Sequence, residues 1–293
     1  MIRALALLCA ILPAACTPRA PAPVANVHYT LGAPYQTAGV WQYPRESYDL
    51  TETGLAVVQS GPHAPLTADG EVYDPKAMAA AQPTLQLPAI ARVTDLETGR
   101  QVVVRINDRG PADPGRMLAV TPRVAELLGF PPSGVAQVRL EVLPSESHTA
   151  ADSLPGSPKL ALAAAPRTAV QAIPLAAPAG IQQVAAATPG TVAAPQAPEA
   201  GPAVPLRLPE AVTAVTPSPG QLWILLSSFH QYKYALMQRQ RLAGLPGEVE
   251  VTSQGGAQEY RARLGPFATV SEADSALAEA IRAGMADARI AVE

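Results

Sequence analysis

Acidic residues that could act as general acids or bases stand at two places in the first half of the chain. Asp108 follows the apolar stretch 102–106, and the end of a strand would hold its carboxyl group rigidly at the edge of a groove. Glu71 follows a turn-forming Asp-Gly pair, and Asp74 stands three residues further on. Carboxyl groups in such positions can deliver and remove protons during a reaction. Burial against an apolar strand would raise the pKa of Asp108 toward the range that this chemistry requires.

Each of these positions also has a purely structural interpretation. The Asp-Arg-Gly-Pro sequence that begins at Asp108 is favourable in a turn. The Asp-Gly pair before Glu71 is a common hairpin signal. Arg109 could bind a substrate carboxylate or pair with a neighbouring acid, and His63 is isolated in a loop rich in glycine and proline. These residues alone leave both interpretations open.

The composition argues against several other classes of function. A net charge of −3 provides no positive field for duplex nucleic acid. The two cysteines and four histidines lack the spacing of metal ligands, so we expect no metal site and no cofactor. The 293 residues include 32 prolines, and no aromatic residue lies between Pro131 and Leu222. One continuous core is therefore not expected.

The elements that would position the acids are short. The clearest strands are 91–94, 101–107 and 136–142. Residues 121–128 fit a helix that ends at Gly129. Short strands with one or two short helices predict a small β-barrel over residues 29–144.

The tail, residues 221–293, has a different organisation. Its pattern follows the order β-α-β-β-α-β, which predicts a ferredoxin-like sandwich. The predicted strands are 223–229, 249–252, 259–264 and 288–292, and the predicted helices are 231–242 and 271–283. Ser271 would begin the second helix, since a hydroxyl group can cap it and the acids that follow favour its first turn.

Residues 145–220 connect the two regions. They contain 13 prolines and no aromatic residue, and Ala, Val, Gly and Thr make up most of the rest. Such a segment buries too little surface to offset the entropy of ordering. We therefore expect a disordered Ala/Pro-rich linker that lets the barrel move relative to the tail.

The N-terminus has the pattern of a secretion signal. Arg3 precedes the apolar residues 4–12, which are too few to span a bilayer as a helix. The sequence Leu-Pro-Ala-Ala-Cys that ends at Cys16 resembles a bacterial lipoprotein signal. This pattern predicts a signal peptide over 1–15, lipidation with palmitate at Cys16 and a short tether over 16–28. Ordinary signal cleavage near the same place is the alternative, and the other cysteine would be removed with the signal.

Two segments of the tail resemble the strand ends of a SPOR domain, the bacterial cell-division module that binds peptidoglycan glycan strands stripped of peptides. They are Ser227-Ser228-Phe229 and Arg261-Ala262-Arg263-Leu264-Gly265-Pro266-Phe267. Aromatic rings stack on sugar faces, and guanidinium groups bind hydroxyls and carboxylates. The resemblance implies a glycan-binding face made of Trp223, Phe229, Arg261, Arg263 and Phe267. Trp223 and Phe267 could instead be ordinary core residues.

The first domain resembles the rare lipoprotein A family of septal lytic transglycosylases over roughly residues 29–142. The similarity includes Tyr35, residues 39–44 and residues 67–74. It is strongest at Val-Val-Arg-Ile-Asn-Asp-Arg-Gly-Pro, residues 103–111. The resemblance implies a six-stranded double-psi β-barrel that cleaves the β-1,4 bonds of peptidoglycan.

The same resemblance implies roles for the acids. A lytic transglycosylase protonates the leaving oxygen and lets the 6-hydroxyl of muramic acid attack, which leaves a 1,6-anhydro end. Asp108 would act first as acid and then as base, Glu71 would assist it, and Asp74 would support them. The residues implied to bind substrate in the barrel are Arg105, Asn107 and Arg109.

Three departures from the family pattern weaken the implied site. Gln82 stands where the family has a functional histidine, and a glutamine can orient a group but cannot carry a proton. Val58-Gln59-Ser60 replace a Trp-Tyr-Gly sequence, and Ala119 replaces an aspartate. The alternative is therefore a peptidoglycan-binding cell-division protein whose barrel has weakened or lost turnover.

Together, the signal, barrel, linker and tail predict a periplasmic lyase of cell wall organisation. Its N-terminal lipid would anchor it to a membrane, with the outer membrane favoured, and its tail would enrich it at the division septum. The expected partners are peptidoglycan glycan strands, the membrane and divisome proteins, and nucleic acid is not expected.

Overall fold

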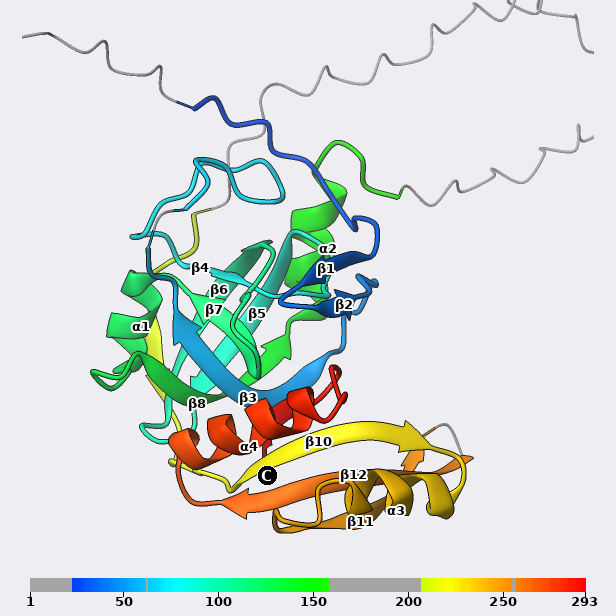
Figure 1. Cartoon of the computed structure of the whole chain (residues 1–293). Coiled ribbons are helices and arrows are strands. Elements are labelled where there is room, and N and C mark those ends of the chain that lie inside the picture. The colour runs from blue at the N-terminus through cyan, green and yellow to red at the C-terminus, as the bar shows by residue number, and fades with distance from the viewer. Residues whose placement is uncertain (1–22, 62, 159–206, 255–256) are drawn as a thin grey trace, which may run out of the picture.

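The computed structural model describes residues 23–61, 63–158, 207–254 and 257–293. These residues form a β-barrel and a smaller unit of a sheet with helices, which lie against each other (Figure 1). The predicted signal peptide, the predicted lipidation site Cys16 and most of the predicted linker lie outside the described residues. Within these ranges, no helix has both the length and the apolar character needed to cross a membrane.

Six strands close the barrel. They are β3 (Thr51–Val58), β4 (Ala79–Ala81), β5 (Ala89–Asp95), β6 (Arg100–Asp108), β7 (Arg116–Val120) and β8 (Val135–Val142). The strands pair in the order β4-β7-β3-β8-β5-β6, and β4 also pairs with β6, which closes the circle. The β3–β7 and β4–β6 pairs are parallel and the others are antiparallel. The predicted six-stranded double-psi β-barrel is confirmed.

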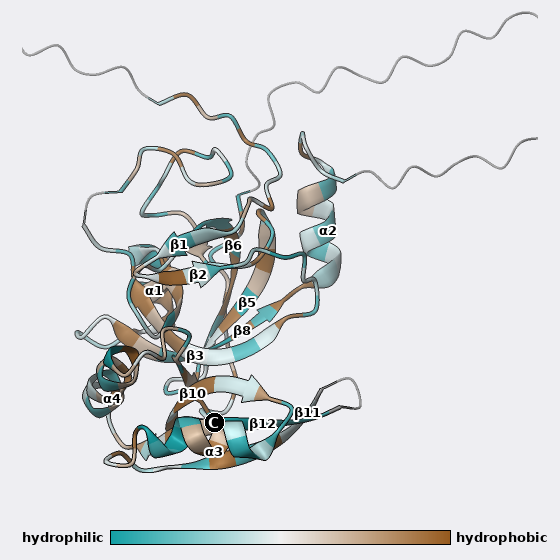
Figure 2. Ribbon diagram, turned by 45° about the vertical axis from the view of Figure 1, so that its right-hand side comes forward, coloured by the Kyte–Doolittle hydropathy of each residue, from teal (hydrophilic) through white to brown (hydrophobic). Residues whose placement is uncertain are grey.

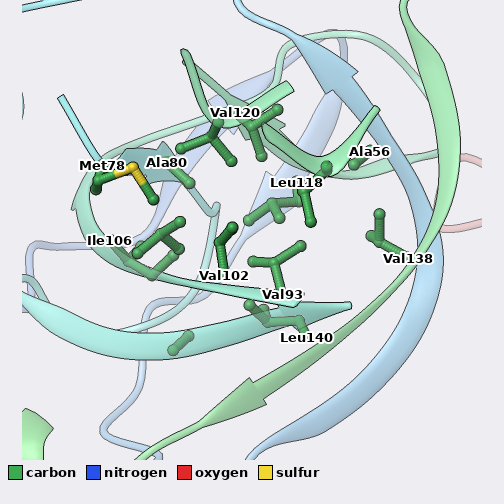
Figure 3. Packing of buried hydrophobic residues seen from close by; sticks show 14 of the residues in the cluster. Ala56, Met78, Ala80, Val93, Val102, Ile106, Leu118, Val120, Val138 and Leu140 are labelled. Atoms are coloured by element: carbon green, nitrogen blue, oxygen red, sulfur yellow. The ribbon is translucent and has the colours of Figure 1, made fainter. Parts of the chain in front are cut away.

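Aliphatic side chains from all sides of the barrel fill its interior (Figure 3). Val93, Val102, Ile106, Leu118 and Val138 point into this interior and are almost fully buried. Successive residues of a strand face opposite sides, so each strand contributes alternate side chains to the core. The packed strand β6 ends at Asp108, which fixes the backbone beside that carboxyl group.

The predicted short helix is present as α1 (Pro122–Leu128). The Thr121 hydroxyl accepts a hydrogen bond from the Val124 amide, and Gly129 ends the helix in a left-handed conformation with φ of 82°. A residue with a side chain would be strained at this φ, which explains why glycine marks the end.

A hairpin that the sequence did not predict lies beside the barrel. It consists of β1 (Tyr35–Thr37) and β2 (Val40–Gln42). Its turn residues Ala38 and Gly39 both have positive φ, as a two-residue hairpin turn requires. Strands of three residues are too short to show a periodic pattern. The hairpin leaves the Trp41 side chain 56% exposed.

The prediction of a disordered linker over 145–220 is wrong at both ends. Helix α2 (Pro144–Asp152) packs on the barrel, where the Ser147 hydroxyl hydrogen-bonds to the amide and the carbonyl of Ile90. Strand β9 (Val212–Ala214) pairs with the edge of β6. Composition does not reveal the order at these two ends. Strand β9 pairs with the edge of β6 through backbone groups, which any composition provides. Helix α2 needs only small side chains to pack on a barrel that is already formed.

The tail has the predicted β-α-β-β-α-β order. Its elements are β10 (Leu222–Phe229), α3 (Tyr232–Gln240), β11 (Gly247–Gln254), β12 (Ala257–Phe267), α4 (Val270–Arg282) and β13 (Arg289–Val292). The sheet order is β11-β12-β10-β13, and every neighbouring pair is antiparallel. Figure 2 shows α4 with both teal and brown segments, as expected for a helix that buries one side. Helix α4 begins one residue earlier than predicted. Its N-cap is Thr269, whose hydroxyl accepts a hydrogen bond from the Glu272 amide, and not the predicted Ser271.

The tail is docked on the barrel. Arg116 of β7 makes a bidentate ion pair with Asp274 of α4, with N–O distances of 2.7 and 2.8 Å. The Thr53 hydroxyl donates a 2.6 Å hydrogen bond to the carbonyl of Val292. Leu55 and Leu96 of the barrel belong to the same buried cluster as the core of the tail. The sequence predicted a barrel that moves relative to the tail, whereas in the described residues the two are in direct contact.

Candidate active site

The carboxyl group of Asp108 is held in one orientation at the end of β6. Its Oδ1 atom accepts hydrogen bonds from the backbone amides of Ala68 (3.0 Å) and Arg109 (2.8 Å). Burial raises the pKa of Asp108, and the two amide donors and the nearby His63 and Arg109 only partly oppose that rise. A carboxyl group with a raised pKa keeps its proton at higher pH, as a general acid must.

Two tyrosines and one histidine lie close to Asp108. Burial raises the pKa of both Tyr35 and Tyr73, and the Asp108 charge adds to the rise in each. The Tyr73 ring stacks on His63 with 4.3 Å between ring centroids. Sequence analysis assigned no role to either tyrosine. The available signal was the position of Tyr73 between Glu71 and Asp74.

Glu71 points into a buried ionic cluster. Its Oε1 atom lies 2.6 Å from Nε of Arg105, and its Oε2 atom accepts a 2.7 Å hydrogen bond from the Asn107 amide. Arg105 also lies 3.5 Å from Oδ2 of Asp69. All four side chains are buried. Arg105 and Asn107, which were implied to bind substrate, therefore have partners inside the protein and join the segment of Glu71 to β6.

Asp69 is the member of this cluster whose pKa is most perturbed. Burial, reinforced by the charge of Glu71, raises the pKa of Asp69 to about 6. The Thr67 hydroxyl (2.7 Å) and the Glu71 amide (3.2 Å) donate hydrogen bonds to its Oδ1 atom. The Asp-Gly turn that sequence analysis identified before Glu71 thus also contributes a charge to the cluster.

Asp74 and Gln82 both have local structural contacts. Asp74 Oδ1 accepts a hydrogen bond from the Lys76 amide (2.9 Å) in a turn. The side-chain oxygen of Gln82 accepts hydrogen bonds from the amides of Thr84 (2.6 Å) and Leu85 (2.7 Å). Gln82 is 2% exposed, so its side chain fixes the loop next to Asp108 and does not face the solvent.

Arg109 binds backbone carbonyls. Its guanidinium donates hydrogen bonds to the carbonyls of Leu85 (2.5 Å), Leu31 (2.6 Å) and Pro83 (3.4 Å). These donors do not pair with a neighbouring acid, and the binding of a substrate carboxylate by Arg109 stays a prediction. Arg109 joins the end of β6 to two other loops of the barrel.

In the tail, the sheet face opposite the helices carries Trp223 and Arg263. The Arg263 guanidinium lies over the Trp223 ring, 4.1 Å from its centroid. Arg263 pairs with Glu248 (2.6 Å) and Glu293 (2.5 Å). These contacts leave Trp223 only 9% exposed. The predicted combination of arginine and aromatic ring is present, but contacts within the protein cover it.

The other residues implied for the glycan-binding face divide between two environments. Phe267 belongs to the buried cluster beneath the sheet, as the core interpretation predicts, and its contact with glycan stays a prediction. Phe229 lies at the end of β10, with its ring 6.1 Å from that of Tyr234. The Arg261 side chain donates a hydrogen bond to the Ser228 hydroxyl (3.0 Å).

The barrel site therefore centres on one half-buried acid. Asp108 has one oxygen fixed by two amides, and tyrosine and histidine rings surround it. Such a group can transfer a proton to and from an oxygen atom of a ligand. In the part of the chain that the structure describes, no cluster of three or more His, Cys, Asp or Glu side chains could hold a metal ion.

Comparison with protein families identifies both domains. Residues 54–140 match the family described as lytic transglycolase, and residues 218–290 match the SPOR domain family.

Several curated proteins named endolytic peptidoglycan transglycosylase RlpA are similar to the chain. The protein of Rickettsia bellii is 34% identical over 124 residues, which cover 41% of this chain and 55% of that protein. The protein of Neisseria meningitidis serogroup A is 36% identical over 131 residues, or 44% of this chain and 55% of that protein. The matched region thus spans little more than half the length of these relatives.

A solved structure is similar to the tail. The crystal structure of the RlpA SPOR domain from Pseudomonas aeruginosa is 21% identical and covers 25% of this chain and 99% of that domain, with a TM-score of 0.23.

Proposed function

We propose that this chain, which joins a barrel of the lytic transglycolase family to a SPOR domain, is an endolytic lytic transglycosylase of peptidoglycan. It cleaves β-1,4 bonds within peptide-poor glycan strands and leaves 1,6-anhydro-muramic ends. It acts in the periplasm at the division septum, anchored through a lipid on Cys16 to a membrane, with the outer membrane favoured. Divisome proteins would be its further partners.

Asp108 would carry both proton transfers. The protonated carboxyl group donates its proton to the glycosidic oxygen while the bond from that oxygen to the muramic C1 atom breaks. The resulting carboxylate then accepts the proton of the muramic 6-hydroxyl as this oxygen bonds to C1. No water enters the reaction, so one acid suffices for both steps. Fixing Oδ1 with two amides leaves Oδ2 for the proton.

Glu71 and Asp74 would act through position. Glu71 is held by Arg105 and Asn107, so it keeps the end of β6 in place and adds negative charge near a developing oxocarbenium ion. Asp74 orders the turn that carries Tyr73 toward Asp108. Tyr73 and Tyr35 can stack on or hydrogen-bond to a sugar ring.

The observation that carries this proposal is the environment of Asp108. Burial raises its pKa, and two amides fix its orientation at the end of a rigid strand. Backbone amides also hold aspartates in turns, as they hold Asp74, so the distinguishing property is the burial of the Asp108 carboxyl group at the end of β6.

The test uses purified protein from residue 23 and sacculi treated with an amidase. The wild-type protein is expected to release glycan fragments with 1,6-anhydro-muramic ends, detected by mass spectrometry. Asp108→Asn should reduce the rate by at least about a hundredfold, because general acid catalysis contributes about 10²–10⁴. Asp49→Asn, which changes an exposed aspartate of the same domain outside the site, is the matched control. Equal rates for both variants, or no anhydro product from the wild-type protein, would contradict the proposal.

A second candidate is a peptidoglycan-binding protein with weak or absent turnover. It is supported by Gln82, whose side chain is fixed by two amides where a histidine is expected from the resemblance. This candidate predicts binding to denuded glycan without cleavage, and a gain of cleavage in Gln82→His. It also predicts that removing residues 221–293 abolishes septal localisation, while Asp108→Asn leaves the division phenotype unchanged.

A further inference from the structure

A cleft of about 450 Å³ lies between the barrel and the tail. On the barrel side it is lined by the β1–β2 hairpin, by residues 82–84 and by the loop 111–117. On the tail side it is lined by Leu225 and by residues 286–291 and 293. Its volume falls within the range of about 300–1,000 Å³ that is typical of ligand sites.

The cleft joins the two sites described above. Gln82 and Pro111 line the cleft near Asp108, the last residue of β6. The backbone N–H of Gln82 donates a 3.1 Å hydrogen bond to the backbone carbonyl of Asp108. At the opposite end, Leu225 and Ala291 pack with Trp223, and Glu293 pairs with Arg263. The cleft therefore borders the segment next to Asp108 and the strands that carry Trp223 and Arg263.

Two side chains of the cleft suit a sugar polymer. Trp41 of the hairpin lines the cleft, and 56% of its surface is exposed. Because it is exposed, its ring does not contribute to the barrel core. Arg289 lies at the start of β13 and is exposed, and none of the ion pairs among the described residues includes it. A ring that stacks and an uncommitted guanidinium are the groups that bind a sugar carrying a carboxylate.

The positions of the acids decide where a carboxylate could bind. Glu52 and Asp113 line the barrel side and would repel an anion there. On the tail side, Asp287 accepts a hydrogen bond from Ser227, and Glu293 shares the Arg263 guanidinium with Glu248. Arg289 is thus the cation of the cleft that an anionic ligand can approach, since Arg116 is paired with Asp274.

We propose that this cleft is a glycan subsite, in which Trp41 stacks on a sugar ring and Arg289 binds the free lactyl carboxylate of a peptide-free muramic acid. This inference rests on the proposed function for its substrate. Arg109 already donates hydrogen bonds to three backbone carbonyls, whereas Arg289 makes none of the ion pairs among the described residues. An attached peptide converts the lactyl carboxylate to an amide, so Arg289 would select denuded strands.

The test measures binding and cleavage separately. Binding of the full chain carrying Asp108→Asn is measured on glycan strands with and without stem peptides. Adding Arg289→Ala should weaken binding to peptide-free strands about tenfold and leave binding to peptide-bearing strands unchanged. Trp41→Ala should weaken binding to both kinds of strand. The matched controls are Arg282→Ala and Tyr43→Ala, an exposed arginine and an exposed aromatic residue outside the cleft.

The outcomes separate the two proposals. If Arg289→Ala binds peptide-free strands as tightly as Arg282→Ala does, the subsite assignment is wrong even where the enzyme cleaves glycan. If the wild-type protein releases no anhydro ends but Arg289→Ala loses the preference for peptide-free strands, the transglycosylase proposal fails and the subsite stands. Equal losses in Arg289→Ala and Arg282→Ala would indicate a general charge effect and overturn the specific role.

Discussion

At the scale of single residues, the barrel site separates Asp108, the proposed proton donor, from several acids that hold the structure. Asp108 accepts hydrogen bonds from two backbone amides, whereas Asp69 and Glu71 share the charge of Arg105 in the interior. A buried ionic cluster contributes little net stability, but it fixes geometry because removing one partner leaves an uncompensated charge. The cluster therefore acts as the support on which Asp108 is positioned.

The raised pKa of Asp69 has a measurable effect on stability. Its pKa of about 6 in the folded protein exceeds its value in an unfolded chain, so the folded state binds the proton more tightly. The free energy of unfolding contributed by this group is largest below pH 4 and decreases as the pH rises through 6, by on the order of 3 kcal/mol. Urea denaturation between pH 4 and 7 measures this, with the difference between wild type and Asp69→Asn isolating the group.

The exposed Asp49 provides the control for that measurement. Asp49→Asn should leave the pH dependence of unfolding unchanged. If the stability of the wild-type protein instead rises between pH 4 and 7 relative to Asp69→Asn, the attraction of Arg105 outweighs burial and the pKa of Asp69 is lowered.

At the scale of elements, the N-cap of helix α1 connects this helix to a strand next to the site. Helix α1 is held at its start by Thr121, whose hydroxyl accepts from the Val124 amide and donates to the Ala77 carbonyl (2.7 Å). Ala77 lies two residues before β4, and the pairing of β4 with β6 closes the barrel. The cap therefore links helix α1 to the strand next to Asp108.

Removing this cap should destabilise the barrel. Thr121→Ala loses both hydrogen bonds, and we expect the free energy of unfolding to fall by about 1–2 kcal/mol. Thr121→Ser keeps the hydroxyl group and should lose less than half of that amount. Urea denaturation of both variants provides the measurement, and equal losses would assign the effect to the methyl group and not to the cap.

At the scale of the whole molecule, the tail is docked on the barrel. The barrel and tail share buried leucines, the hydrogen bond from the Thr53 hydroxyl and the Arg116–Asp274 ion pair. Gly115 permits this approach, because a Cβ atom there would lie 2.5 Å from Leu277.

A double-mutant cycle tests this docking. Arg116→Ala and Asp274→Ala remove opposite ends of one bidentate pair, so their effects on the free energy of unfolding should be coupled by about 1 kcal/mol. The arginine side chain is 10% exposed and the aspartate 40%, which favours a measurable coupling. Additive effects would mean that the two domains do not hold this contact in solution.

The sequence by itself determined the two domains, the order of elements in the tail and the strand that ends at Asp108. These features follow from local patterns, namely alternation of apolar residues, caps and turn residues, which need no knowledge of distant contacts. It also contained the motifs of both families, and through them the acids to examine.

Only the tertiary structure decided what each of those residues contacts. Four polar side chains of the barrel could bind a ligand as far as the sequence shows, yet in the structure each has a partner within the protein. They are Gln82, Arg105, Asn107 and Arg109. The same holds for the ends of the linker, which gain order from packing on the barrel and pairing with its edge, contacts that composition cannot reveal. Burial and partnership are properties of the packed chain, so the cleft between the domains, with Trp41 and Arg289 on its two sides, became visible only in the folded molecule.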